Sequence, residues 1–449
     1  MGRAILVILA AAAASPMLVR AAPGYDPWTW LLWGREVAGG TLSTTAGPAF
    51  KPLPVAVCAL LAPLGSAAPV VWVVLVRAAA SLACWLAYRL GRELGGSRLG
   101  GALAAVGVAL AGGFALEAAR GGEAPLVIAG ALGAIACWRA GRLRVALALG
   151  AACALLRVEA WPFLALAGVL AWRRDPGARP LLGALALLVP AAWFMPEWLG
   201  SGDLLRSGAR ARIPNPGQPA LADVPALASL EAAAGLLLVP PWLGVALALR
   251  EPRTRGLAAA GAAWIGVVAV MAQAGFSGEP RYALPGVALL AIAGAAGLAR
   301  TAADREETIH RAQPDESSPR PWVAVAVGLV VVVVAALPAL MDLSRVRAAQ
   351  AHQWTLARDL DEAVRAAGGR EAVLACGRPY VGPYRGPLMA YALRVAKRDV
   401  EPDATPRTPG VVFRARLTAA APPAPQASPP FRAAARAGQW EVLRSCSAN

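Results

Sequence analysis

Residues 23–36 read PGYDPWTWLLWGRE and lie between two apolar runs, at 4–21 and 68–88. Each run is long and apolar enough to cross a bilayer as a helix. Pro27 suits the first turn of a further helix, with Asp26 before it as the N-cap. The tryptophans that follow are typical of the level of the lipid headgroups. The stretch therefore predicts a surface helix within a long loop, residues 22–67, that joins two transmembrane helices.

Similar apolar runs recur as far as about residue 341 and explain the composition of the chain. Hydrophobic residues make up 57% of it and charged residues 16%, against about 25% charged in a typical soluble protein. We therefore predict an all-α polytopic membrane protein with about eleven transmembrane helices, followed by a small α/β domain. The predicted spans are 4–21, 68–88, 99–118, 124–138, 145–158, 160–172, 180–198, 226–249, 256–275, 284–299 and 321–341. The proline-bounded stretch 53–65 is expected to lie in the outer interface or to re-enter the membrane.

Groups of arginines between the spans predict the orientation. With the N-terminus in the cytoplasm, all of these groups fall on the cytoplasmic side, as the positive-inside rule requires. They are Arg89, Arg92 and Arg98; Arg139, Arg142 and Arg144; Arg173, Arg174 and Arg179; Arg250, Arg253 and Arg255; and Arg300, Arg305 and Arg311. The C-terminal domain is then extracytoplasmic in a cell membrane, and the net charge of +16 needs no nucleic acid to explain it. We expect segment 4–21 to be a retained span, although it also resembles a cleaved signal peptide.

Acidic residues gather at the outer ends of the spans, together with further bases. The acids are Asp26, Glu36, Glu117, Glu123, Glu159, Glu197, Asp203, Asp223 and Glu279, and the bases are Arg35, Lys51, Arg120, Arg157, Arg206, Arg210, Arg212 and Arg281. A charge at the edge of an apolar span is costly unless it is paired or faces water. As a set these residues indicate a polar cavity that opens outward. For any single residue, a solvated loop charge or a structural ion pair is the alternative.

Two residues of the first loop are candidates for chemistry. Asp26 either caps the surface helix or holds a carboxylate just outside the bilayer, where a lipid headgroup would arrive. Lys51, in the stretch FKPLP at 50–54, either binds phosphate as a point charge or anchors the chain by snorkelling to the membrane surface.

Together, the acidic residue in a long first loop, the aromatic amphipathic helix and the Lys-Pro-x-Pro turn resemble the GT-C superfamily of membrane glycosyltransferases. That superfamily includes protein O-mannosyltransferases, the lipid A aminoarabinose transferase and mycobacterial arabinosyl- and mannosyltransferases. The stretches RVEAWP at 157–162 and GEPRYALP at 278–285 resemble segments of uncharacterised actinobacterial members. The resemblance covers roughly residues 1–341 and lies more in topology than in motifs.

The resemblance implies a transferase that takes a sugar from a polyprenyl-phosphate donor and passes it to an extracytoplasmic glycan, lipid or protein. Asp26 would be the base on the acceptor hydroxyl. The donor phosphate would be held by Lys51, Arg120, Arg157 and Arg281, and the sugar or acceptor by Glu123, Glu159, Tyr25, Trp28, Asp203 and Tyr282. A single Asp followed by Pro departs from the adjacent Asp-Glu pair of the protein mannosyltransferases, which counts against a protein acceptor. The residues themselves suit this chemistry, because a carboxylate can deprotonate a hydroxyl and cations can stabilise a departing phosphate.

Other functions are weighed by what they would require. A transporter or flippase should show internal repeats and charged or broken helices near mid-membrane, yet no repeat is visible and Arg77 is the only clear mid-span charge. A non-catalytic assembly protein is a further alternative. The Gly/Pro-rich loop 200–219 predicts either a mobile lid or a linker. No His/Cys cluster is visible, so we predict no zinc site, while a divalent cation on carboxylates stays open.

Residues 342–449 are expected to form the extracytoplasmic α/β domain, and residues 1–341 the membrane domain. The pattern predicts a helix over 350–367, strands at 371–377, 410–414 and 440–443, and a Pro-rich loop at 421–430. Cys376 and Cys446 are the only cysteines in this domain. Outside the cytoplasm they are expected to form a disulfide rather than two free thiols. The domain is expected either to bind an acceptor glycan or to cover the site.

Overall fold

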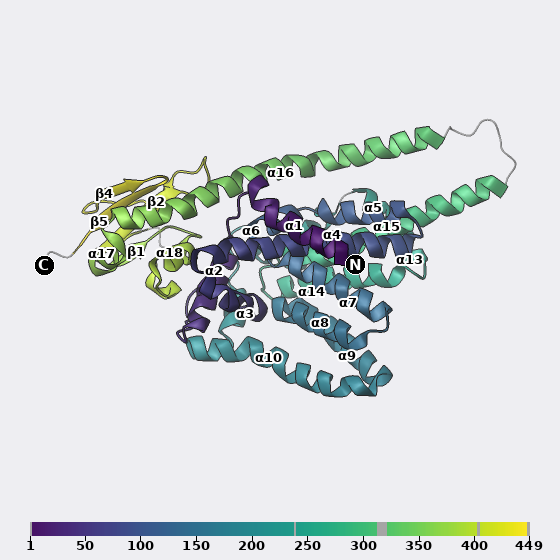
Figure 1. Ribbon diagram of the computed structural model, residues 1–449, viewed down its shortest axis with the longest axis horizontal. Coiled ribbons are helices and arrows are strands. Elements are labelled where there is room, and N and C mark those ends of the chain that lie inside the picture. The colour runs from purple at the N-terminus through teal and green to yellow at the C-terminus, as the bar shows by residue number, and fades with distance from the viewer. Residues whose placement is uncertain (1, 238, 312–320, 402–404, 447–449) are drawn as a thin grey trace.

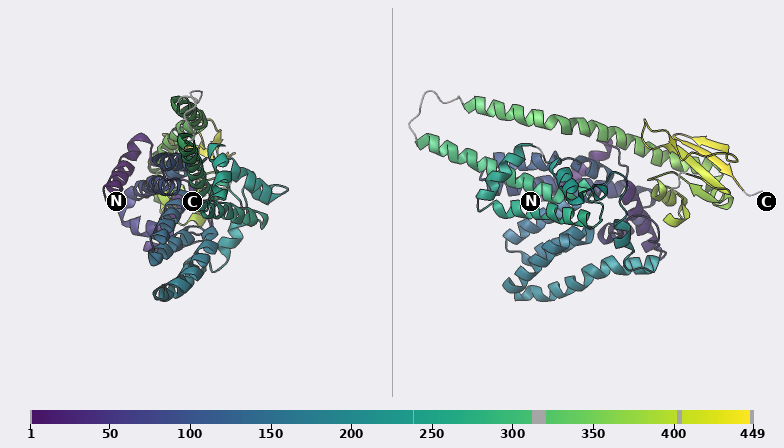
Figure 2. Two further views of the ribbon diagram at one scale, coloured as in Figure 1. Left: turned by 90° about the vertical axis from the view of Figure 1, so that its right-hand side faces the viewer. Right: turned by 180° about the vertical axis from the view of Figure 1, so that it is seen from behind.

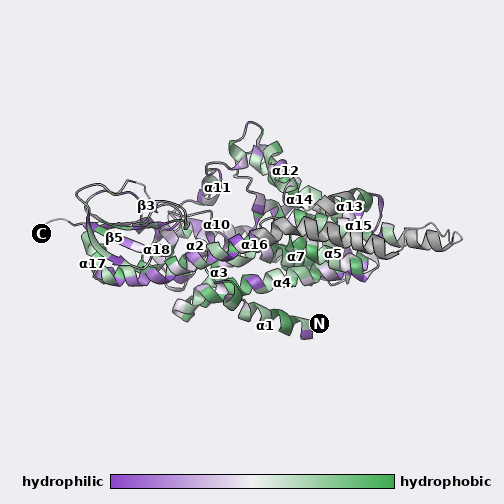
Figure 3. Ribbon diagram, turned by 90° about the horizontal axis from the view of Figure 1, so that it is seen from above, coloured by the Kyte–Doolittle hydropathy of each residue, from purple (hydrophilic) through white to green (hydrophobic). Residues whose placement is uncertain are grey.

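The computed structural model describes residues 2–237, 239–311, 321–401 and 405–446, without the side chains of 239–243 and 303–341. These ranges form a helical body with a small sheet at one end of the long axis (Figure 1). The long helix α16 (Pro321–Ala366) runs along the body and ends beside the sheet, so it continues across the predicted boundary at 341/342. Hydrophobic residues concentrate in the body and hydrophilic ones in the C-terminal domain (Figure 3).

The chain begins with four helices that contain the predicted surface segment. They are α1 (Gly2–Leu18), α2 (Tyr25–Ala38), α3 (Pro52–Leu61) and α4 (Ala68–Gly95), with a 3-10 turn at Ala62–Ala67 before α4. Pro52 begins α3, where its missing N–H costs nothing. Helices α2 and α3 cross closely at Gly34, where a Cβ would lie 2.5 Å from the carbonyl carbon of Cys58. The close crossing fixes the end of the first loop, and with it Lys51, against α2.

The rest of the body consists of shorter helices around a central one. In order they are α5 (Arg98–Ala109), α6 (Phe114–Arg120), α7 (Ala124–Arg139), α8 (Leu143–Leu156), α9 (Trp161–Arg174), α10 (Arg179–Ser201), α11 (Arg206–Ala211), α12 (Pro225–Ala234), α13 (Val239–Arg250), α14 (Arg255–Gln273) and α15 (Pro280–Arg311). The central helix is α15, whose Leu284 and Ile292 are fully buried. Its neighbour α13 approaches so closely that a Cβ at Gly244 would clash with the carbonyl oxygen of Gly294. The rigid core therefore holds the start of α15, which carries Arg281 and Tyr282.

Four helical stretches of the described chain are long and apolar enough to cross a membrane: Pro52–Gly95, Pro176–Ser201, Arg255–Gln273 and Pro280–Ala302. The pair α5 and α6, bent by 63°, would add a fifth, and α1, α7 and α8 are shorter apolar helices. The structure thus bears out an apolar helical architecture, while the count of about eleven stays a prediction.

Two predicted spans are broken in the structure. The span 226–249 divides into α12 and α13, because Gly235 ends the first helix and two prolines open the second. The span 99–118 bends between α5 and α6, where Gly113 has φ of +80°. The two breaks meet, since Gly112 N–H donates to Leu236 O at 2.8 Å. Each break thereby satisfies a backbone group that the other exposes.

Arg77, in the middle of α4, is used as a structural tie. Its guanidinium donates to the carbonyl oxygens of Val19 at 2.8 Å, Arg20 at 3.0 Å and Ala119 at 3.1 Å. These carbonyls end α1 and α6, where intrahelical partners are lacking. The one clear mid-span charge therefore joins three segments of backbone.

The C-terminal domain packs a five-stranded sheet against α16, α17 (Gly369–Cys376) and α18 (Gly386–Leu393) (Figure 2). The strand order is β1 (Arg378–Tyr380), β2 (Gly410–Arg416), β5 (Trp440–Ser445) and β4 (Arg432–Ala437), with β1 parallel to β2, the other pairs antiparallel, and the short β3 (Pro423–Ala424) on β2. Helix 350–367 and the strands near 410 and 440 are confirmed. The strand at 371–377 is wrong: Val373 and Cys376 face the core one helical turn apart.

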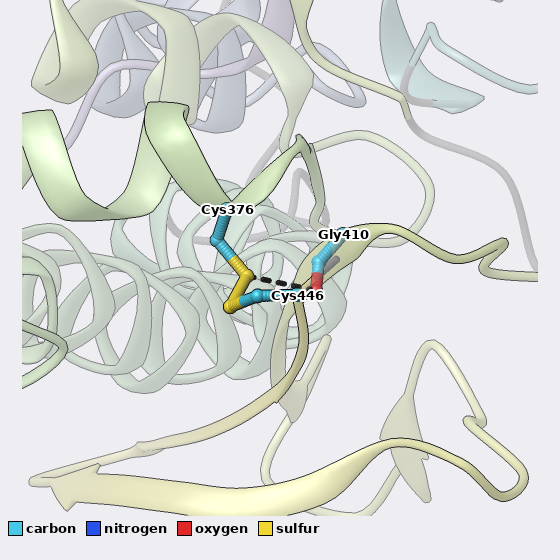
Figure 4. The surroundings of a disulfide bond; sticks show 3 residues. All are labelled: Cys376, Gly410 and Cys446. Atoms are coloured by element: carbon cyan, nitrogen blue, oxygen red, sulfur yellow. Dashed lines mark hydrogen bonds between the residues drawn. A yellow bond between two sulfur atoms is a disulfide. The ribbon is translucent and has the colours of Figure 1, made fainter. Parts of the chain in front are cut away.

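The predicted disulfide is present. Cys376 and Cys446 are bonded at 2.01 Å and join the end of α17 to the segment after β5 (Figure 4). The remaining cysteines, Cys58, Cys84, Cys137 and Cys153, are free and lie in apolar helices.

Candidate functional site

A cavity of about 850 Å³ opens between the first loop, the start of α15 and the C-terminal domain. Segments far apart in the sequence meet here. Of the residues predicted from the sequence, its wall includes Tyr25, Asp26, Lys51, Arg120, Arg157, Glu159, Arg281 and Tyr282. The structure thus brings six of the eight charged residues that were given a role to one wall, in a cavity that apolar side chains also line.

Asp26 lies in the first turn of α2, and its carboxylate pairs with Arg281 at 3.0 Å. The N-cap is Gly24, and no side chain caps the helix. The prediction of Asp26 as N-cap is therefore wrong, because α2 begins at Tyr25, before Pro27. With its side chain 11% exposed, the carboxylate is free of any capping role and faces the cavity.

Arg281, at the start of α15, holds two carboxylates at once. It pairs with Glu279 as well as with Asp26, and its guanidinium lies 3.5 Å from the hydroxyl of Tyr282. The arginine is 19% exposed and Glu279 22%. This group, defined here as the open pair Asp26–Arg281 with Glu279, lines the cavity.

A second group of charges is closed and buried. Lys51 and Arg157 both bind Glu123, the latter at 3.0 Å, and Arg157 also binds Glu159 at 3.0 Å. The four residues are between 2% and 8% exposed. Two cations thus neutralise two anions in what we call the closed network.

The closed network sits on an aromatic surface. The guanidinium of Arg157 lies 3.5 Å from the centre of the Tyr282 ring, and Lys51 faces the ring of Trp30. Glu123 does not line the cavity but lies behind Lys51 and Arg157. Burial alone would raise the pKa of Glu123, yet Lys51, Arg281 and Arg157 hold it well below its usual range. Glu123 is therefore an anion that orients the two cations.

Tyr25 lies next to Asp26 on the cavity wall. Burial and the neighbouring Asp26 carboxylate raise the pKa of Tyr25 to about 12. Its phenol therefore keeps its proton and can donate a hydrogen bond at neutral pH. Its ring meets the ring of Tyr384 edge to face, with the centroids 6.4 Å apart.

The loop between α10 and α12 forms one side of the cavity and is tied to the first loop. Arg206 donates to the carbonyl oxygens of Gly47 at 2.9 Å and Pro48 at 2.8 Å. Both Arg206 and Ser207 bind the fully buried Glu197. The loop is thus attached to the segment that carries Lys51, while its predicted role as a lid or a linker stays a prediction.

Besides Glu123, two predicted residues lie away from the cavity wall. Asp203 is exposed, and its carboxylate accepts the N–H of Leu205 at 2.8 Å. Trp28 packs against Tyr391 of α18, with the ring centroids 5.3 Å apart, and so helps to dock the C-terminal domain onto α2. Among the described residues, no three His, Cys, Asp or Glu side chains come together as metal ligands would.

Sequence reasoning missed two contributors to the wall. Arg210, on α11, lines the cavity and has no carboxylate partner among the described residues. Tyr384 comes from the C-terminal domain, in the loop between β1 and α18. Arg210 could have been found from the sequence, because it stands among the outer bases. Nothing in the sequence around Tyr384 indicates that it lines the same cavity as Tyr25, which lies more than 300 positions earlier in the chain.

Solved structures show which fold this arrangement belongs to. ArnT from Cupriavidus metallidurans bound to undecaprenyl phosphate aligns with a TM-score of 0.55 at 16% identity, over 98% of this chain and 97% of its own. Its apo state aligns with a TM-score of 0.51 at the same identity and coverage. No protein-family model matches the chain, and no curated protein matches it significantly. The likeness covers nearly the whole of both chains, and the chain therefore shares the fold of ArnT.

Proposed function

We propose that this protein is a membrane glycosyltransferase that moves a sugar from a polyprenyl-phosphate donor to an acceptor hydroxyl outside the cytoplasm, with Asp26 as general base. One observation carries the proposal: a cavity wall that sets the Asp26 carboxylate among Lys51, Arg157 and Arg281. The shared fold supports it, since ArnT was solved bound to undecaprenyl phosphate.

The transfer step needs only groups of this wall. Asp26 accepts the proton of the acceptor hydroxyl while the hydroxyl oxygen bonds to the anomeric carbon of the sugar. The bond between that carbon and the phosphate oxygen breaks, and its electron pair leaves with the polyprenyl phosphate. Cations on the wall stabilise the charge that develops on the leaving phosphate. Lys51, Arg120, Arg157 and Arg281 are the candidates for this task, with Arg210 added by the structure.

Binding of the donor can release the Asp26 carboxylate from its ion pair with Arg281. In the described state Arg281 holds Asp26 and Glu279. A donor phosphate competes with Asp26 for the same guanidinium, because bidentate contacts to phosphate suit arginine. Its arrival leaves the Asp26 carboxylate free to accept a proton.

The proposal also includes the side of the membrane on which the cavity lies. The cavity lies under the C-terminal domain, whose disulfide suits an oxidising compartment. The protein then resides in the cell membrane with its N-terminus in the cytoplasm and the domain outside. Transport has less support: the breaks at Gly112 and Leu236 bind each other, and the described residues of both breaks lie outside the cavity wall.

The test is transfer by purified protein, offered a panel of radiolabelled polyprenyl-phosphate sugars and membrane acceptors. Wild type should label one acceptor, and Asp26→Asn should lose roughly 10²–10⁴-fold in rate. Asp203→Asn is the matched control, because Asp203 lies outside the cavity wall, and it should keep full activity. Full transfer by Asp26→Asn would remove the assigned base, and no transfer from any donor would count against the enzyme.

A further inference from the structure

Tyr384 is a residue whose identity the fold alone does not account for. Its φ is +63°, a conformation that bulky side chains adopt rarely and that glycine adopts without strain. Burial of its side chain also contributes little to stability, because the residue is 54% exposed. Strained backbone of this kind persists where the surrounding structure enforces it, typically at functional sites.

The loop that carries Tyr384 is held on both sides. Before it, Val381 is fully buried and its N–H donates to Glu401 O at 3.2 Å. After it, Arg385 is 4% exposed and donates to Ala415 O at 3.0 Å. The ring of Tyr384 is thus presented to the cavity by a preorganised loop, which lowers the entropy lost when a ligand binds.

The domain itself is fixed over the first loop. Arg35 of α2 donates to Tyr391 O of α18 at 2.8 Å, and Leu32 of α2 is part of the hydrophobic core of the C-terminal domain. This docking sets Tyr384 against Tyr25, at a centroid distance of 6.4 Å and an interplanar angle of 84°. The two rings form an aromatic corner next to Asp26.

We propose that this aromatic corner, Tyr25 and Tyr384, binds a sugar ring of the acceptor, so that the acceptor is a carbohydrate. The inference rests on the proposed function and adds the chemical class of its acceptor. The face of a sugar ring presents C–H groups with partial positive charge, which suit the negative face of an aromatic ring. A ring held at Tyr25 brings its hydroxyls beside the neighbouring Asp26. Arg281, which pairs with Asp26, lies between this sugar site and the other cations that would hold the donor phosphate on the same wall.

The experiment compares Tyr384→Gly with Tyr384→Phe. Glycine removes the ring and relieves the positive φ, so the variant should fold at least as stably as wild type; phenylalanine keeps the ring. With the donor that wild type uses, Tyr384→Gly should raise the acceptor KM at least tenfold and leave the donor KM within about twofold. Tyr384→Phe should stay close to wild type. An unchanged acceptor KM in Tyr384→Gly, an equal rise in the donor KM, or an equal loss in Tyr384→Phe would overturn the proposal.

Binding is also measured without catalysis. Saturation-transfer NMR would use methyl and octyl glycosides of mannose, arabinose and glucosamine, with octanol as the control without a sugar. Wild type should transfer saturation to the ring protons of at least one methyl glycoside, and Tyr384→Gly should not. Binding of octanol and the octyl glycosides alone would mean a lipid-chain site and would overturn the proposal. Sugar binding that depends on Tyr384, with no transfer from any donor, would uphold this site and refute the proposed function.

Discussion

The two groups of charges at the cavity differ in how firmly the ions within each group are paired. In the closed network, each of Lys51, Glu123, Arg157 and Glu159 is paired with an opposite charge within the group, and the cations are anchored by the fully enclosed Glu123. In the open pair, Asp26 and Arg281 are bound by one contact of 3.0 Å and both reach the cavity. A buried ion pair costs several kcal/mol to break, whereas a pair in contact with water exchanges partners readily. The closed network is therefore the harder of the two groups to rearrange and holds Lys51 and Arg157 in place on the cavity wall, whereas the open pair can change partners when a substrate binds.

The largest effect on stability is expected from breaking the closed network. Arg157→Met leaves Glu159 buried without its counter-ion and should lower the free energy of unfolding by about 3–5 kcal/mol. Thermal unfolding in detergent measures the loss. The matched control is Arg144→Met, which removes an exposed pair with Asp175 at 3.3 Å and should cost less than about 1 kcal/mol. Equal losses in the two variants would mean that the closed network is no harder to break than an exposed pair.

A substitution in the open pair should change substrate binding instead. Arg281→Gln removes a cation that we assign to the donor phosphate, so the donor KM should rise about 10–100-fold, the worth of a charge-assisted hydrogen bond. The melting temperature should change little, because Asp26 and Glu279 line an open cavity and are not left enclosed without a partner. Arg212→Gln serves as the control, since Arg212 lies outside the cavity wall. A donor KM that does not move, with a melting temperature that falls, would mean that Arg281 stabilises the fold instead.

The smallest effect concerns Glu36, a buried carboxyl of α2 outside both groups. Burial raises the pKa of Glu36 to about 7. The folded protein therefore binds this proton more tightly than the unfolded chain, and stability is lost as the pH rises from the unfolded pKa through 7. Glu36→Gln keeps an acceptor for the N–H of Ser43 and carries no charge. Its melting temperature should exceed that of wild type by roughly 2–4 °C at pH 8 and match it at pH 4. A difference in melting temperature between Glu36→Gln and wild type that is the same at both pH values would refute the assignment.

The charged part of the site could be predicted from the sequence, because a charge at the edge of an apolar span is an exception that needs a reason. This holds for Asp26, Lys51, Arg157 and Arg281, which the structure brings to one wall. The partner of each charge could not be predicted, since pairing depends on how the helices pack. Glu123, expected to bind sugar, turned out to lie behind Lys51 and Arg157.

The errors in secondary structure have local causes. The run AVLAC at 372–376 alternates too little to separate a strand from a helix, and Gly368, with φ of +96°, begins a helix there. The aromatic corner lay beyond the reach of sequence reasoning for another reason. Tyr384 meets Tyr25 only because α18 docks on α2, and nothing in the sequence of either helix indicates that the two pack together.

The most direct test of Asp26 as the general base measures donor binding and sugar transfer together in Asp26→Asn. Undecaprenyl phosphate should raise the melting temperature of this variant at least as much as that of wild type, because the cations that hold phosphate are intact and Asp26 no longer competes for Arg281. Sugar transfer by the same preparation should fall roughly 10²–10⁴-fold. If transfer persists, or if donor binding is lost together with it, Asp26 is not the base and the open pair is not the working part of the site.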